Sequence, residues 1–144
     1  MMKRISILFA MLLGMTAFTL VACADGRVIP PEKLPVAAQQ FVQQTFPGVT
    51  IAFAQKDGLK YEIHLNNGTE IEFDRKGIWD KVDCNLNPVP AALVPQPIAA
   101  YVTATFPGVS IVKIDKERYG YEIELSNDLE LKFNKQGQLI MYDD

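Results

Sequence analysis

The second half of the chain repeats the first half at a fixed offset of sixty residues and without a gap. Residues 34–84 and 94–144 share 18 identities over 51 aligned positions. The segment Thr45–Val49 returns unchanged as Thr105–Val109. An ungapped internal match of this length indicates two copies of one supersecondary unit. An expectation derived from one copy can therefore be checked on the other.

Each copy begins with apolar residues at helical spacing and continues with apolar residues that alternate. In the first copy, the stripe from Ala37 to Phe46 fits one face of a helix, with glutamines opposite. A Pro-Gly pair ends it, because proline cannot continue the helix and glycine tolerates left-handed dihedral angles. From Val49 onward the apolar period is two, which is typical of half-buried antiparallel strands.

We therefore predict an α+β fold of two tandem repeats, each with one helix followed by a four-stranded antiparallel sheet and with the helices packed on one sheet face. The predicted strands cover residues 49–54, 61–65, 70–73 and 78–84, and in the second copy residues 109–116, 119–126, 129–134 and 138–142. The predicted organisation is signal peptide 1–22, N-terminal linker 23–33, first repeat 34–84, linker 85–93 and second repeat 94–144.

Residues 1–22 have the pattern of a secretory signal peptide, with a short basic start, an uncharged apolar run over 5–21 and small residues after it. A membrane-spanning helix is the alternative, since the run approaches spanning length. Residues 20–23 also resemble a bacterial lipobox, which would make Cys23 a lipidated first residue. An A-x-A cleavage site with Asp25 as the mature start fits equally. The expected location is periplasmic, or lipid-anchored and facing the periplasm or the cell surface.

Composition narrows the class of partner. Without residues 1–22 the chain carries 12 basic and 17 acidic residues, a net charge of −5. This disfavours nucleic acid, which attracts basic surfaces.

If Cys23 is removed or lipidated, Cys84 is the one thiol left. A lone thiol in an exported chain can be reactive, but a small apolar residue at a strand end is the expected role.

Several motifs together resemble the PepSY-like family of exported bacterial proteins. They are a helix with Phe-Pro-Gly, then Tyr-Glu-Ile-x-Leu, Glu-Ile-x-Phe-Asp-x-x-Gly and the segment from Trp79 to Cys84. The family is similar in fold to the beta-lactamase inhibitory protein, itself a tandem of helix-plus-four-strand units. The resemblance spans residues 34–144. It implies inhibitory or regulatory binding to envelope proteins and brings no catalytic residues. The second repeat departs from the motif, because it has Leu139 where the first has Trp79 and Asp144 where the first has Cys84.

The sequence offers little for catalysis or for metal binding. A nucleophile and base would have to be Cys84 and His64, expected on different strands, so we predict no catalytic residues and no cofactor. Cys/His spacing for zinc is absent, and we predict no metal site. Calcium prefers carboxylate oxygens, but the chain has no EF-hand loop. Aspartates at expected turns and strand ends are Asp57, Asp74, Asp80, Asp83, Asp115, Asp128, Asp143 and Asp144.

The polar side of the predicted sheet is the pattern that favours a binding function. If Phe73 pairs with Ile78, then Trp79 and Lys81 join this side. An exposed tryptophan among charges is typical of a binding hot spot. The alternative is a solvated face whose like charges oppose aggregation. The predicted protein-binding face consists of Glu62, His64, Glu70, Glu72, Trp79, Lys81, Glu122, Glu124, Glu130 and Lys132.

These observations predict an exported, non-enzymatic module that binds an envelope protein, for example a protease, or a peptide through its acidic open face, as an inhibitor or regulator. The alternative function is a periplasmic sensor or carrier for a small ligand or calcium. We expect no nucleic-acid partner, and membrane contact only through a lipid anchor on Cys23.

Overall fold

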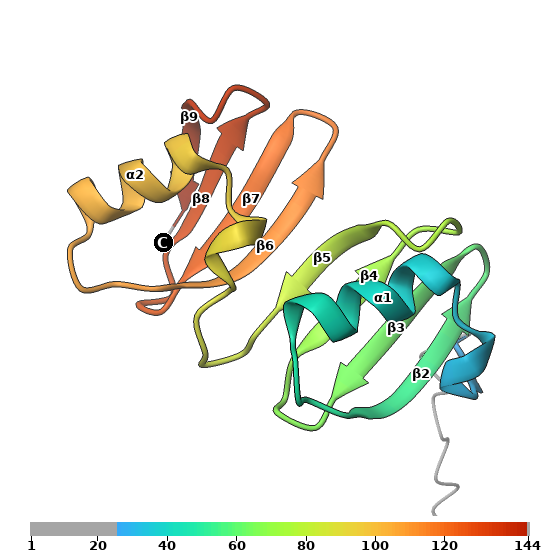
Figure 1. Cartoon of the computed structure of the whole chain (residues 1–144). Helices are drawn as coiled ribbons and strands as arrows, with labels where there is room; N and C mark the ends of the chain where they lie inside the picture. The colour runs from blue at the N-terminus through green and yellow to red at the C-terminus, as the bar shows by residue number, and fades with distance from the viewer. Residues whose placement is uncertain (1–25, 144) are drawn as a thin grey trace, which may run out of the picture.

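The computed structural model describes residues 26–143, so the predicted signal peptide, Cys23 and Asp144 lie outside the described residues. Helix α1 covers Val36–Thr45 and helix α2 covers Gln96–Thr105 (Figure 1). Each follows a short 3-10 turn, η1 at Pro31–Lys33 and η2 at Ala91–Leu93. The strands are β1 Arg27–Ile29, β2 Ile51–Asp57, β3 Lys60–Leu65, β4 Glu70–Phe73, β5 Trp79–Asp83, β6 Ile111–Glu117, β7 Gly120–Leu125, β8 Glu130–Asn134 and β9 Leu139–Asp143.

All nine strands in residues 26–143 form one antiparallel sheet in chain order. The prediction of two repeats that each form a four-stranded sheet is therefore wrong. The two halves are joined because β5 pairs with β6, with Val82 opposite Ile114. In addition, β1 comes from the segment expected to be a linker, and it pairs with β2. Both pairings use backbone N–H and C=O groups that would stay unpaired at the edges of separate sheets.

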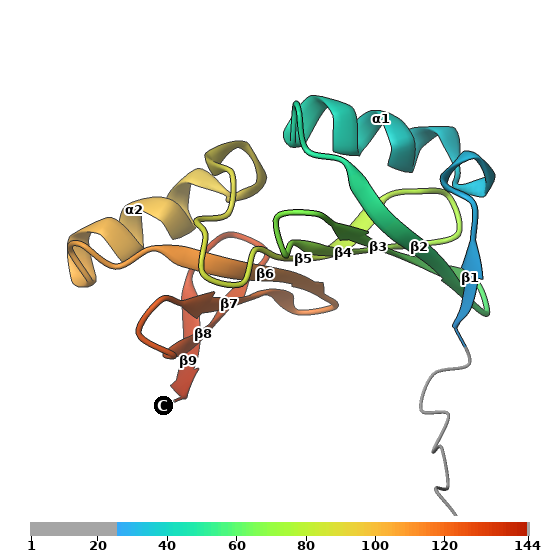
Figure 2. The ribbon, with the colours of Figure 1, turned by 90° about the horizontal axis from the view of Figure 1, so that it is seen from below.

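Both helices lie on the same face of the sheet (Figure 2). The sheet bends away from them at both ends, towards β1 and towards β9, so the helix-free face is concave (Figure 2). We call this helix-free side the open face. No helix within residues 26–143 is long and apolar enough to cross a membrane.

The core lies between the helices and the sheet and is built alike in the two repeats. Phe73 packs edge-to-face against Phe41 of α1, with ring centroids 5.6 Å apart. Phe133 packs in the same way against Tyr101 of α2, at 5.5 Å. Such pairs contribute about 0.5–1.5 kcal/mol beyond the burial of their area. A row of fully buried aliphatic side chains runs beneath both helices and consists of Ile63, Ile71, Val82, Ile114, Ile123 and Leu131.

The hairpins after β2 and β6 differ between the repeats. Gly120 has a φ of 149° and pairs with Asn134. A Cβ atom at this position would lie 2.2 Å from the carbonyl oxygen of Phe133, a distance that no side chain tolerates. Only glycine fits this close backbone approach. The equivalent residue of the first repeat is Lys60, whose side chain is largely exposed.

Candidate functional site

The open face carries two rows of side chains that run across the strands. The rows follow from the antiparallel register, because directly paired residues point to the same side of the sheet. The first row is Phe53, His64, Glu70, Asp83, Lys113, Glu124 and Glu130. The second row is Val28, Gln55, Glu62, Glu72, Lys81, Asp115, Glu122, Lys132 and Met141.

The two rows are strongly acidic, with eight carboxylates against three lysines. Most of their side chains are half-buried, since neighbours across the strands cover their stems. The structure brings together nine of the ten residues predicted to form the binding face. These nine are Glu62, His64, Glu70, Glu72, Lys81, Glu122, Glu124, Glu130 and Lys132.

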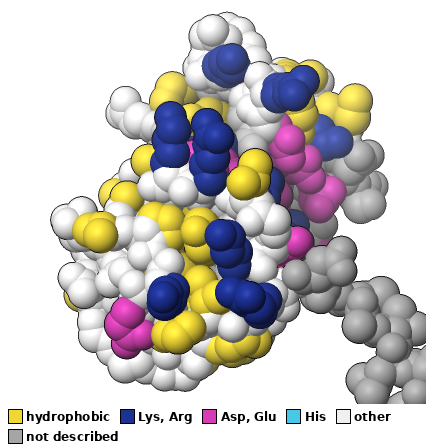
Figure 3. All heavy atoms as spheres, turned by 90° about the vertical axis from the view of Figure 1, so that its right-hand side faces the viewer, with side chains coloured by type: hydrophobic (Ala, Val, Ile, Leu, Met, Phe, Trp, Pro, Cys, Tyr) yellow, Lys and Arg dark blue, Asp and Glu magenta, His cyan; other side chains and the backbone are white. Residues whose placement is uncertain are grey.

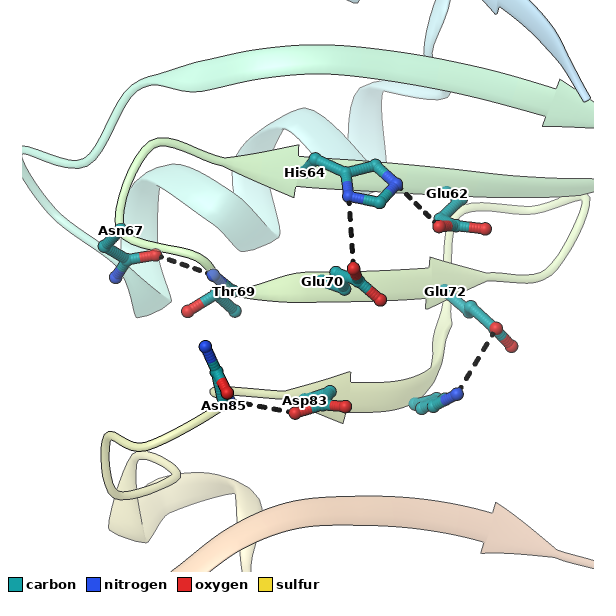
Figure 4. Close-up of polar contacts among 9 residues, drawn as sticks. Glu62, His64, Asn67, Thr69, Glu70, Glu72, Asp83 and Asn85 are labelled. Atoms are coloured by element: carbon teal, nitrogen blue, oxygen red, sulfur yellow. Dashed lines mark hydrogen bonds and ion pairs between the residues drawn. The ribbon is translucent and has the colours of Figure 1, made fainter.

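The charges of the first repeat form a local network (Figure 4). The His64 imidazole lies between two carboxylates, with Nε2 at 2.6 Å from Glu62 and Nδ1 at 3.5 Å from Glu70. Lys81 reaches Glu72 at 3.7 Å. On the other side of the β5–β6 junction, Lys113 lies 4.0 Å from Asp115 in the second repeat.

The electrostatics of the face centre on the β5–β6 junction. Partial burial alone would lower the pKa of Lys81, but the carboxylates of Glu72 and Asp115 outweigh it and hold that pKa above its ordinary value. Burial raises the pKa of Asp115, and Lys81 and Lys113 offset only part of this rise. At the junction, Lys81 therefore holds its proton more tightly than an ordinary lysine, and it lies near the partly buried carboxylate of Asp115.

Phe53 is a member of the face that the sequence did not predict. Its ring stacks on the His64 imidazole, with centroids 4.1 Å apart and planes at 15°. Strict alternation would place Phe53 on the same side as Ile51. A bulge at Ala52 changes this, because Ile51 pairs with Leu65 while Phe53 pairs with His64. The exposed fraction of Phe53 is 39%, so an aromatic surface lies at this end of the acidic rows.

Trp79 was expected on the open face, and that placement is wrong. Phe73 pairs with Trp79 rather than Ile78, and a bulge at Asp80 separates Trp79 from the pair formed by Glu72 and Lys81. Trp79 therefore points to the helix side, where its ring lies 6.3 Å from that of Phe41. The Lys116 ammonium of β6 lies 3.7 Å from the centre of the Trp79 ring. This cation–π contact joins the two repeats on the side away from the acidic rows.

Cys84 and His64 do not form a catalytic pair. Cys84 is buried in the core beneath α1, with 1% of its surface exposed, whereas His64 lies on the opposite side of the sheet. Burial raises the pKa of the Cys84 thiol, and the nearby charge of Asp83 raises it further. A thiol with a raised pKa is a poor nucleophile, so Cys84 has the character of a core residue.

Two of the eight aspartates considered for calcium accept backbone N–H groups of neighbouring residues. The Asp74 Oδ1 atom accepts the backbone N–H groups of Lys76 and Ile78 at 2.8 and 3.0 Å. Asp83 accepts the N–H of Asn85 at 2.9 Å (Figure 4). Asp144 lies outside the described residues. In residues 26–143, the one group of three ligand-bearing side chains within 4.8 Å is Glu62, His64 and Glu70.

Two pockets, one of them lined by basic side chains, lie away from the acidic rows. Lys and Arg side chains are spread over the side of the molecule that Figure 3 shows, with some Asp and Glu side chains between them. Arg27, Lys33 and Lys56 line a pocket of about 240 Å³ near β1. Another pocket, of about 420 Å³, lies between η1, the end of α1 and β2 and contains none of the predicted face residues. These three basic side chains thus lie near β1 and outside the acidic rows.

The chain matches a known family and several solved structures. The family described as "Putative beta-lactamase-inhibitor-like, PepSY-like" matches residues 18–68 and 59–141, which confirms the predicted resemblance. A putative calcium-regulated periplasmic protein from Bacteroides thetaiotaomicron is 40% identical with a TM-score of 0.78, over 83% of this chain and 98% of that chain.

Two further structures come from Bacteroides vulgatus. One is a putative periplasmic protein of the DUF2874 family, 36% identical with a TM-score of 0.78, over 85% of this chain and 99% of that chain. The other, a putative periplasmic protein, is 35% identical with a TM-score of 0.78, over 83% and 99%. No curated protein matches the chain. The description of these relatives as periplasmic supports the predicted export, while lipidation of Cys23 stays a prediction.

Proposed function

The chain belongs to the PepSY-like family, and we propose that it is an exported, non-enzymatic module that binds a basic surface of another envelope protein or peptide. Binding takes place on the open face and inhibits or regulates the partner. The observation that carries this proposal is the pair of rows with eight carboxylates against three lysines on a concave surface that neither α1 nor α2 covers.

The form and the charge of this face both suit recognition of a partner. A surface of one predominant charge steers an oppositely charged partner and speeds the encounter. Because the side chains project from one hydrogen-bonded sheet, the face exists before the partner arrives, and little ordering is needed on binding. Phe53 and His64 add a stacked aromatic patch at one end of the rows, and such groups carry much of the energy of an interface.

The test compares two variants with the same change in net charge. In the double variant Glu72→Gln/Glu122→Gln, both changes lie on the open face. In the control Glu32→Lys, the change lies in η1, away from the rows. The immobilised wild-type protein should retain a basic protein or peptide from an envelope extract and release it at moderate salt. We expect the double variant to bind at least about tenfold more weakly, which corresponds to about 1.4 kcal/mol.

Glu32→Lys should bind the captured partner as the wild type does. Equal binding by the wild type and the double variant would contradict the use of the open face. Equal losses in both variants would show that only the total charge matters and would also contradict it. Circular dichroism of all three proteins checks that the substitutions leave the fold intact.

A calcium-responsive sensor is a second candidate function. One relative at 40% identity is described as calcium-regulated, and the open face supplies the carboxylate oxygens that calcium prefers. Calcium at about ten times its Kd would stabilise the native state by about 1.4 kcal/mol, so the melting temperature should rise in millimolar calcium but not in equal magnesium. An unchanged melting temperature in millimolar calcium would remove this candidate.

A further inference from the structure

Three side chains on the open face of the first repeat form a mixed nitrogen and oxygen ligand set. Glu62 and His64 come from β3, and Glu70 lies opposite His64 on β4. One ligand atom from each lies within 4.8 Å of the other two. At this spacing, modest side-chain rotations bring an imidazole nitrogen and two carboxylate oxygens to the roughly 2.0–2.2 Å of zinc–ligand bonds. We propose that Glu62, His64 and Glu70 bind a divalent transition-metal ion of the zinc type.

The imidazole is held in place before an ion arrives. Phe53 stacks on one face of the His64 ring at 4.1 Å, and Glu62 and Glu70 flank its two nitrogens (Figure 4). Only 21% of the His64 side chain is exposed. The stacked Phe53 ring limits rotation of the imidazole, so its nitrogens stay close to the two carboxylates that would bind the same ion. The site therefore loses little side-chain freedom on binding.

The second repeat shows that this arrangement is not a general feature of the sheet. The residue equivalent to His64 is Glu124, so the nitrogen ligand is missing. The residue equivalent to Phe53 is Lys113, which pairs with Glu124 and places a cation where the first repeat has an aromatic ring. The second repeat thus supplies its own positive charge. In the first repeat, the row from His64 through Glu70 to Asp83 has no lysine.

The ligand set also decides which kind of ion fits. Imidazole suits zinc, copper and nickel, whereas calcium and magnesium prefer oxygen ligands alone. Three protein ligands would leave a fourth position on zinc for water or a partner group. This site does not depend on the proposed protein partner or on the calcium response, because the isolated chain should bind zinc.

Zinc titration of the isolated protein tests the proposal. The protein, stripped with chelator and free of any histidine tag, is titrated with zinc chloride in a calorimeter. We expect one ion per chain. His64→Gln should weaken binding at least tenfold, and Glu70→Gln should weaken it several-fold. Glu130→Gln, the equivalent substitution in the second repeat, should change the affinity less than twofold. Circular dichroism checks that each variant is folded.

Nuclear magnetic resonance gives a second and independent readout. His64 is the one histidine of the chain, so a single set of ring signals reports on the site. Zinc should shift these signals, while millimolar calcium should leave them in place. Equal zinc affinity in the wild type and His64→Gln, ring signals that do not respond to zinc, or no binding below about 1 mM would each overturn the proposal. None of these results would affect the capture experiment, which tests the protein partner in metal-free buffer.

Discussion

The two repeats share one framework and differ at the positions that give a surface its chemistry. In both, an aromatic residue of the helix packs on a buried phenylalanine of the sheet, at 5.6 Å and 5.5 Å. The first repeat adds Phe53, His64 and Trp79, where the second has Lys113, Glu124 and Leu139. The aromatic packing beneath the helices is thus alike in the two repeats, while three positions give the first repeat its additional aromatic and imidazole groups.

The sharpest difference in stability should come from the hairpin that follows β6. Gly120→Ala would force a Cβ atom against the backbone of Phe133 and Asn134, so β7 and β8 must separate. We expect a loss of about 3 kcal/mol or more in the free energy of unfolding, measured in urea by circular dichroism. In the first repeat, Lys60→Ala should change it by less than about 0.5 kcal/mol. Similar losses in both variants would contradict the close approach at Gly120.

The next effect concerns the aromatic residue beneath α1. Trp79→Leu gives the first repeat the residue of the second and removes the contacts with Phe41 and Lys116. We expect a loss of about 1–2 kcal/mol in the free energy of unfolding. The reciprocal change Leu139→Trp, at an exposed position, should cost less than about 0.5 kcal/mol. If Trp79→Leu were neutral, the contact between the repeats would carry no energy.

The smallest effect depends on pH. Burial raises the pKa of Asp115 above its ordinary value of 3.8, so the native state binds the Asp115 proton more tightly than the unfolded chain does. The free energy of unfolding therefore falls as the pH rises from below 3.8 through the raised pKa. Asp115→Asn removes this decrease in the free energy of unfolding. It also places a neutral residue at the position equivalent to Gln55 of the first repeat. At pH 7 the variant should be more stable by less than about 1 kcal/mol, because solvent screens the charge.

This gain should disappear near pH 3, where Asp115 is protonated in both states. Thermal melts of the wild type and Asp115→Asn across this pH range measure it. A variant that is less stable at pH 7 would show that the contacts of Asp115 with Lys81 and Lys113 outweigh its burial.

Much of the local structure could be predicted, because helices and strands are encoded by the spacing of neighbouring apolar residues. The helix before each Phe-Pro-Gly and the strands around Ile63 and Ile123 follow from that spacing. The union of the two sheets could not be predicted, since an internal repeat carries no information on contacts between its copies. The three-residue strand β1 was also missed, because Arg27–Ile29 is too short to show a period.

The candidate face was predicted except where a single residue interrupts the alternation. The bulges at Ala52 and Asp80 move Phe53 onto the open face and Trp79 off it. A bulge adds one unpaired residue and reverses the facing of the residues beyond it. Composition gives little sign of such an insertion. Glu62, Glu70 and Glu122 lie in strands without an inserted residue, so their side of the sheet could be predicted from spacing alone. Whether these residues bind a partner stays a prediction.

The continuous sheet has an electrical consequence. From His64 on β3 to Glu130 on β8 the first row crosses five strand-to-strand spacings, roughly 24 Å at about 4.8 Å each. The Debye length in physiological salt is about 8 Å, so charges at the two ends of the row scarcely interact. Although one hydrogen-bonded body carries the whole face, its ends act on a ligand as separate electrostatic surfaces. Substitutions at His64 and at Glu130 should therefore have additive effects on the free energy of binding.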